Sequence, residues 1–122
     1  MNKLIPLALA AIIAVAVPLH AFAETPAGPL NCSYYSSKYN GRRTASGQRF
    51  NNNRLTAASK TYSMGTRLKL TNVKNGKSAI VTVNDRGPYV SGREISVTRR
   101  AAQQMGFLHA GVTQVNTEVL SK

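Results

Sequence analysis

The stretch Val83-Asn84-Asp85-Arg86-Gly87-Pro88-Tyr89-Val90 starts as a β-strand and ends in a turn. Alternating aliphatic residues precede it, and the Gly-Pro pair closes it. Asp85 is the single aspartate of the chain, and the only other carboxyl side chains belong to Glu24, Glu94 and Glu118. A strand-to-turn position on a rigid scaffold suits a catalytic group at a cleft rim. Asp85 is therefore a candidate acid/base, and the alternative is a structural carboxylate that binds backbone N–H groups around Gly87.

The segment before this stretch has the pattern of a β-hairpin. Residues 66–73 alternate, which places Leu68 and Leu70 on one face, and residues 78–85 return as a strand rich in Ile and Val. Asn75-Gly76 lies between the two strands and predicts a type I′ turn, since both central residues of that turn need positive φ. The two-residue period places Asp85 on the face formed by Ala79, Val81 and Val83, at the end of a buried row.

The rest of the chain reads as short strands and one short helix. Thr98 is a predicted N-cap for a helix over 99–105, with Ala101, Ala102 and Met105 inward and Gly106 as the stop. Further strands are predicted at residues 32–36, 55–58, 95–97 and 112–120. Many short strands with Gly-rich turns and one helix favour a mainly β, compact barrel over a layered α/β fold.

The N-terminal 23 residues have the features of a cleavable signal peptide. Lys3 supplies the positive start, residues 4–19 are almost wholly apolar, and Ala21-Phe22-Ala23 is a small-x-small cleavage pattern. Residues 24–30 read as a linker, and residues 31–122 as one small domain. The expected location is periplasmic or secreted, with no stable membrane insertion after cleavage and with no lipid-attachment motif at Cys32.

The charge balance limits the class of partner. The chain carries 16 basic and 4 acidic residues, a formal net charge of +12, which favours anionic partners such as cell-wall polymers. Export argues against nucleic acid as the target.

Cys32 is the only cysteine, so no internal disulfide can form, and we expect it to be buried. The chain offers no metal-ligand set and no cofactor motif, and His109 reads as a surface residue rather than a catalyst.

The tyrosines of the chain are interspersed with arginines and suit a saccharide-binding surface, because a tyrosine offers both a flat apolar face and a hydroxyl. The rim of an ordinary core would have the same composition. The residues concerned are Tyr34, Tyr35, Tyr39, Tyr62 and Tyr89, interspersed with Arg42, Arg43, Arg49 and Arg86.

Several blocks occur in the order and spacing of the rare lipoprotein A (RlpA-like) family. They are Ser33-Tyr34-Tyr35, residues 40–51, Leu55-Thr56-Ala57-Ala58, residues 65–72 and the Asn-Asp-Arg-Gly-Pro block at 84–88. The resemblance covers nearly all of the chain after the leader. It implies a six-stranded double-psi β-barrel, as in expansins and barwin-type proteins. It also implies endolytic lytic transglycosylation of peptidoglycan glycan strands.

The resemblance implies roles for particular residues. Asp85 matches the family's main acid/base, and Tyr35, Gln48, Ser59, Arg86 and Tyr89 are the expected substrate-binding residues. A lytic transglycosylase uses the muramyl 6-hydroxyl as the nucleophile, so one carboxyl group can act as acid and base in turn. An ordinary glycosidase needs two such groups.

The sequence departs from the family pattern at three positions. Gln48 stands where the family usually has Glu, Ser59 where it has His, and Ser96 where a second Asp is common. Glu94 lies two residues from the last of these, on the same strand face, and is a candidate substitute. Gln48 cannot exchange a proton at neutral pH.

Three functional hypotheses follow. The leading one is an exported lytic transglycosylase with Asp85 as the acid/base. The second is a non-enzymatic, expansin-like wall-binding or wall-loosening module, which the residues at positions 48 and 59 favour. The third is a secreted effector acting on a host or a competitor.

Overall fold

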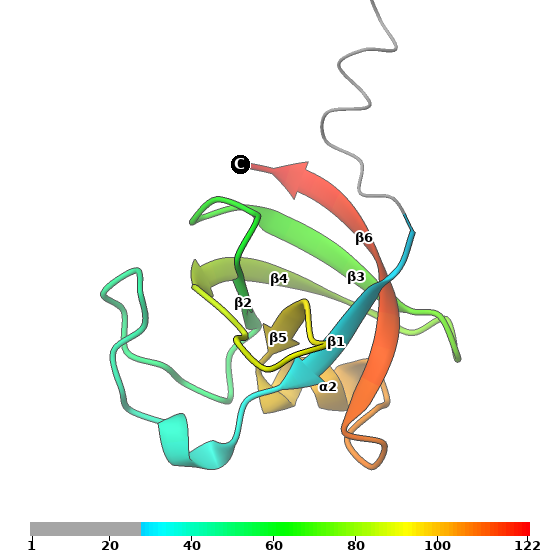
Figure 1. Ribbon diagram of the computed structural model, residues 1–122, viewed down its shortest axis with the longest axis horizontal. Coiled ribbons are helices and arrows are strands. Elements are labelled where there is room, and N and C mark those ends of the chain that lie inside the picture. Colours follow the sequence, from blue (N-terminus) through cyan, green and yellow to red (C-terminus); the bar gives the residue numbers. More distant parts are fainter. Residues whose placement is uncertain (1–27) are drawn as a thin grey trace, which may run out of the picture.

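The computed structural model describes residues 28–122, and the predicted leader lies outside these residues. Six strands form a closed barrel in the order β1-β5-β2-β4-β3-β6 (Figure 1). They are β1 (Leu30–Tyr34), β2 (Thr56–Ser59), β3 (Arg67–Asn72), β4 (Ser78–Asp85), β5 (Ile95–Val97) and β6 (Val112–Ser121). A 3-10 turn, η1 (Ser37–Tyr39), follows β1, and the helix α2 (Arg99–Gln104) follows β5.

Two parallel pairs distinguish this barrel from an up-and-down one. β1 pairs with β5 and β2 pairs with β4 in parallel, whereas the other four pairings are antiparallel. Among the neighbours in the barrel, only β3 and β4 are joined as a hairpin. The expectation of a mainly β barrel with one short helix is confirmed. Most strand pairing therefore joins segments that lie far apart in the chain.

Aliphatic side chains fill the barrel interior, as the alternation in the sequence predicts. Leu68, Leu70 and Val81 are fully buried, and the helix contributes Ala101 and Ala102 from its inner face. Cys32 is buried too, and burial raises the pKa of its thiol to about 12. The helix begins as expected, because the Thr98 hydroxyl accepts a hydrogen bond from the N–H of Ala101.

The predicted type I′ turn at Asn75-Gly76 is wrong. Asn72 donates its N–H to the Lys77 carbonyl and accepts from the N–H of Gly76, so the loop has four residues, 73–76. Tertiary contacts account for the difference, because the Asn72 and Asn75 amides both donate to the Met105 carbonyl at the end of the helix. Gly106 has φ +74°, which strains any residue with a side chain, and a Cβ there would also lie 2.7 Å from Asn75 Nδ2.

Other boundaries differ by one or two residues. β1 starts at Leu30 and ends at Tyr34, so it lies nearer the N-terminus than the predicted 32–36, and η1 takes up the following segment. The 3-10 turn was not predicted, and Ser36 caps it by accepting from the N–H of Lys38. Residues 35–55 then form a long loop that projects from the barrel, coloured cyan to green in Figure 1.

Candidate active site

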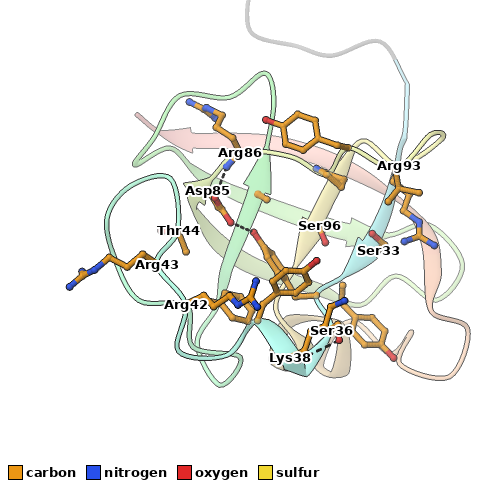
Figure 2. A pocket seen from close by; sticks show the side chains of 18 residues that line it. Ser33, Ser36, Lys38, Arg42, Arg43, Thr44, Asp85, Arg86, Arg93 and Ser96 are labelled. Carbon is orange, nitrogen blue, oxygen red and sulfur yellow. Dashed lines mark hydrogen bonds between the residues drawn. The ribbon is translucent and has the colours of Figure 1, made fainter.

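Asp85 lies where β4 leaves the barrel. The pairing of β2 with β4 shifts in register between Ala57 and Ala58, so that Val83 faces Ala57 and Asp85 faces Ala58. Asn84 is thus an extra residue in β4, as in a β-bulge, a feature that re-aims side chains beside active sites. Val83 stays buried, whereas Asp85 is half-buried and lines a cleft of about 640 Å³ (Figure 2).

Three donors from separate segments hold the Asp85 carboxylate. The Tyr35 hydroxyl donates to Oδ2 at 2.5 Å. The N–H groups of Ala45 and Arg86 donate to Oδ1 at 2.8 and 2.9 Å. The residue after β1, the long loop and the end of β4 therefore meet at this one side chain. The structural role considered above is present, and it coexists with exposure to the cleft.

Tyr35 is a neutral donor in this arrangement. Burial, together with the hydrogen bond to Asp85, raises the pKa of its phenol well above the usual range. The ring stacks on Phe50 with centroids 4.3 Å apart and meets Tyr39 edge-on at 6.0 Å. Its orientation is therefore fixed by packing on one side and by the carboxylate at its tip.

The Arg86 side chain stabilises the turn that follows β2. Its Nη1 donates to the carbonyl oxygens of Ser59 and Tyr62, each at 2.7 Å. The Ser59 hydroxyl accepts from the N–H groups of Thr61 and Tyr62. This serine therefore shapes the turn whose carbonyl groups bind Arg86. Ser59 is only 1% exposed, and the cleft lining includes its neighbour Ala58 but not Ser59 itself.

Gln48 and Glu94 lie outside the cleft lining. Gln48 Oε1 accepts from Asn84 Nδ2 at 3.2 Å, and Gln48 lines a separate hollow with Asn84 and Arg49. Glu94 Oε1 accepts from the N–H of Asn31 at the start of β1. Within residues 28–122, no hydrogen bond joins Gln48, Ser59 or Glu94 to Asp85. Asp85 is consequently the one carboxylate in the cleft lining.

Tyr89 lines the cleft and is 77% exposed, and Lys60 Nζ lies 5.7 Å from its ring centroid. Tyr89 follows Gly87 and Pro88. Gly87 has φ +123°, a backbone conformation in which a residue with a side chain would be strained. Of the five predicted substrate-binding residues, Tyr35, Arg86 and Tyr89 thus share the cleft with Asp85, whereas Gln48 and Ser59 do not.

Other features of the cleft were not predicted. The Ala45 N–H has no side-chain signal in sequence, because any residue with a free backbone amide can supply it. Lys38, Phe50 and Arg93 also line the cleft.

Among residues 28–122, no cluster of His, Cys, Asp and Glu side chains is suited to hold a metal ion. The same part of the chain has no helix with the length and apolar character of a membrane span.

Known families and proteins bear on these observations. Residues 29–117 match the family described as "Lytic transglycolase". The chain belongs to this RlpA-like, double-psi β-barrel family. RlpA of Treponema pallidum is 51% identical over 69% of this chain and 26% of its own length. The "Endolytic peptidoglycan transglycosylase RlpA" of Neisseria meningitidis is 46% identical over 72% of this chain and 37% of its own. The chain thus spans about a quarter to a third of these relatives.

Solved structures confirm the fold class. A Clavibacter michiganensis expansin in complex with cellohexaose superposes with a TM-score of 0.60 at 20% identity, over 75% of this chain and 49% of the expansin. Cerato-platanin 3 of M. perniciosa gives 0.59 at 18% identity, over 77% of this chain and 95% of its own. At this level of identity the likeness shows the fold alone.

Proposed function

We propose that this chain is an exported cell-wall enzyme, an endolytic peptidoglycan transglycosylase that cleaves glycan strands to anhydro-muramyl ends. The observation that carries the proposal is the Asp85 carboxylate, held by three donors and open to a cleft of about 640 Å³. The family membership and the activity named for the relatives support it. The predicted leader at residues 1–23 supports export to the periplasm or beyond.

The proposed reaction needs one proton-transfer group. Asp85 starts in its protonated form and gives its proton to the glycosidic oxygen as the bond to the anomeric carbon breaks. It then takes the proton of the muramyl 6-hydroxyl as that oxygen bonds to the same carbon. No water is consumed, and the carboxyl group ends in its starting state. Holding the 6-hydroxyl close to the anomeric carbon supplies part of the rate enhancement.

The surrounding residues have supporting roles in this reaction. Tyr35 and the Ala45 N–H position the carboxylate, because they bind one oxygen each. Tyr89 offers an exposed ring for stacking on a sugar face. Arg86 holds the cleft wall through the two carbonyl groups it binds. Gln48 lies behind this wall and would act on the site through Asn84.

A digest of purified sacculi with the chain from residue 24 onward tests the proposal. We expect anhydro-ended products with the native sequence and a loss of about 100-fold or more for Asp85→Asn, the range usual for a lost acid/base. Glu118→Gln is the matched control, since Glu118 is an exposed carboxylate on β6. Equal product from the native sequence and Asp85→Asn would remove Asp85 from the mechanism.

A second candidate function is an expansin-like, non-enzymatic wall-binding module. The observation that favours it is the placement of Gln48, Ser59 and Glu94 away from Asp85, which leaves the cleft with one carboxylate. Cosedimentation with sacculi without new anhydro ends would establish this function in place of the enzyme.

A further inference from the structure

The cleft beside Asp85 is strongly cationic. Five of its lining residues are basic, namely Lys38, Arg42, Arg43, Arg86 and Arg93, and Asp85 is its one acid. The Asp85 carboxylate already accepts three hydrogen bonds from Tyr35, Ala45 and Arg86. The positive charge of the cleft is therefore not neutralised by the protein's own acids.

Two of the five cations are engaged by the protein. Arg86 donates to the Ser59 and Tyr62 carbonyl groups, and Arg43 donates to the Gly47 carbonyl at 2.7 Å. In the described part of the chain, the side chains of Lys38, Arg42 and Arg93 take part in no hydrogen bond or ion pair. Figure 2 shows Lys38 and Arg42 on one side of the cleft and Arg93 across from them.

Lys38 and Arg42 converge on the same aromatic ring. Lys38 Nζ lies 5.4 Å and Arg42 Cζ lies 5.6 Å from the centroid of Tyr39. Cation–π contacts at exposed sites are weak. They leave both side chains without an anionic partner. An anionic group placed beside either cation would gain charge-assisted hydrogen bonds.

The chemistry of these cations suits a carboxylate. The arginine guanidinium is a planar fork that matches a carboxylate with two parallel hydrogen bonds, and lysine adds a point charge. A muramyl residue without its peptide carries a lactyl carboxylate, and a stem peptide, where present, carries carboxylates of its own. Neutral polymers such as chitin or cellulose carry neither.

We propose that Lys38, Arg42 and Arg93 form a carboxylate-binding rim that selects acidic glycan strands over neutral ones. The inference rests on the proposed function for the identity of the polymer. The rim determines which strand binds beside Asp85, whereas Asp85 performs the chemistry. Binding and cleavage are therefore separable measurements.

The test measures dissociation constants by calorimetry with Asp85→Asn protein, so that no ligand is consumed. The probes are peptide-free glycan strands with free lactyl carboxylates, the same strands amidated with carbodiimide and ammonia, and chitohexaose. We expect the amidated strands to bind at least fivefold more weakly than the free ones. We expect K38Q/R42Q to weaken binding of the free strands to the amidated level and to leave chitohexaose binding unchanged.

The double variant R67Q/K69Q is the matched control, because it removes one arginine and one lysine from exposed positions of β3 and changes the net charge equally. Its binding of free strands should change less than twofold. Equal losses for the two double variants would overturn the rim and leave only an effect of net charge. Equal binding of free and amidated strands would overturn it as well.

Peptide-bearing strands distinguish the two sources of carboxylate. In them the lactyl group is part of an amide bond, so tight binding that K38Q/R42Q abolishes assigns the rim to peptide carboxylates, and weak binding assigns it to lactyl groups. Both results support carboxylate recognition. The dissociation constants alone test the rim. Failure of the proposed enzyme function would instead be seen in the digest, as an absence of anhydro-ended products.

Discussion

The barrel wall and the long loop at residues 35–55 are built on different principles. The barrel holds its shape through strand pairing around an apolar interior that includes Leu68 and Val81. The loop buries few side chains and is held mainly by hydrogen bonds, such as those from Arg43 to Gly47 and from Arg49 to Gly41. The loop can therefore vary its side chains with little effect on the fold, whereas the barrel cannot.

The two regions meet at Asp85, and this junction explains how the site is made. The barrel supplies the carboxylate at the end of β4, and the loop supplies the Ala45 N–H that binds it. The loop also docks through the N–H of Ser46, which donates to the Asn84 carbonyl at 3.2 Å. The barrel thus gives the site its rigidity, and the loop supplies groups that surround the carboxylate.

Leu68→Ala should cause a larger loss of stability than the other variants below, because it acts on the barrel core. The side chain is fully buried, so we expect a loss of about 3 kcal/mol in the free energy of unfolding, from lost transfer energy and a residual cavity. Urea unfolding measures it. Ile80→Ala is the control, because Ile80 is 41% exposed on β4 and should lose less than about 1 kcal/mol. Similar losses at both sites would contradict the assigned core.

Asn72→Ala tests the polar contact that anchors the hairpin to the helix. The buried Asn72 amide donates to the Met105 carbonyl, and its Oδ1 accepts from Thr113 Oγ1 at 2.8 Å. Removal leaves these partners unsatisfied, so we expect a loss of about 2 kcal/mol. Thermal unfolding compared with Asn116→Ala, an exposed asparagine on β6, checks it. A loss no greater than that of the control would contradict the anchoring role.

Tyr35→Phe tests the contact between the loop and the barrel, because it removes the hydrogen bond to Asp85 and keeps the ring on Phe50. We expect the rate of anhydro-end formation to fall about tenfold through loss of positioning. At pH 7 the stability loss should be about 1 kcal/mol, comparable with Tyr34→Phe, which removes the phenol bond to the Leu108 carbonyl. An unchanged rate would exclude Tyr35 as a positioning residue.

The pH dependence of stability gives an independent check on Tyr35. Its folded pKa is raised above that of the unfolded chain, so the neutral phenol stabilises the fold fully below about pH 10. That contribution is lost as the pH rises toward the folded pKa. We expect the stability difference between the native sequence and Tyr35→Phe to stay constant up to about pH 10 and to shrink above it. A difference that grows above pH 10 would contradict the sign.

Arg49→Gln should have the smallest effect, confined to the loop. Loss of the hydrogen bond to the Gly41 carbonyl should change global stability by no more than about 0.5 kcal/mol. Hydrogen exchange at the Gly41 and Phe50 amides, which bond across the loop, should accelerate while β3 is unaffected. Arg54→Gln is the control, since that side chain is exposed and outside these contacts. Uniform acceleration in β3 would contradict a separate loop.

Local patterns were sufficient for much of the fold. The alternation around Leu68 and Leu70 predicted the burial of β3, and Thr98 predicted the start of the helix. The turn at Asn75-Gly76 failed because a distant carbonyl, that of Met105, competes for the asparagine amides. Local propensity cannot register a partner 30 or more residues away in the chain.

The candidate site was predicted in part for the same reason. Asp85, Tyr35 and Tyr89 occupy one cleft, as expected. Gln48 and Ser59 stand where the sequence departs from the family pattern; the first packs on Asn84 outside the cleft lining, and the second shapes a turn. Family spacing identifies aligned positions, but the tertiary structure decides which of them share the cleft with the carboxylate.

The amino-acid order alone determined that this chain is a barrel of short strands with one polar strand end carrying its single aspartate. Alternation and turn residues are local properties, and they suffice to sort side chains into interior and exterior. Only the closed tertiary structure decided which donors reach that aspartate and which cations stay unpaired around it. Those contacts join Tyr35 and Ala45 in the loop to Asp85 at the end of β4, across 50 and 40 residues of chain, so the tertiary fold rather than local preference brings them together.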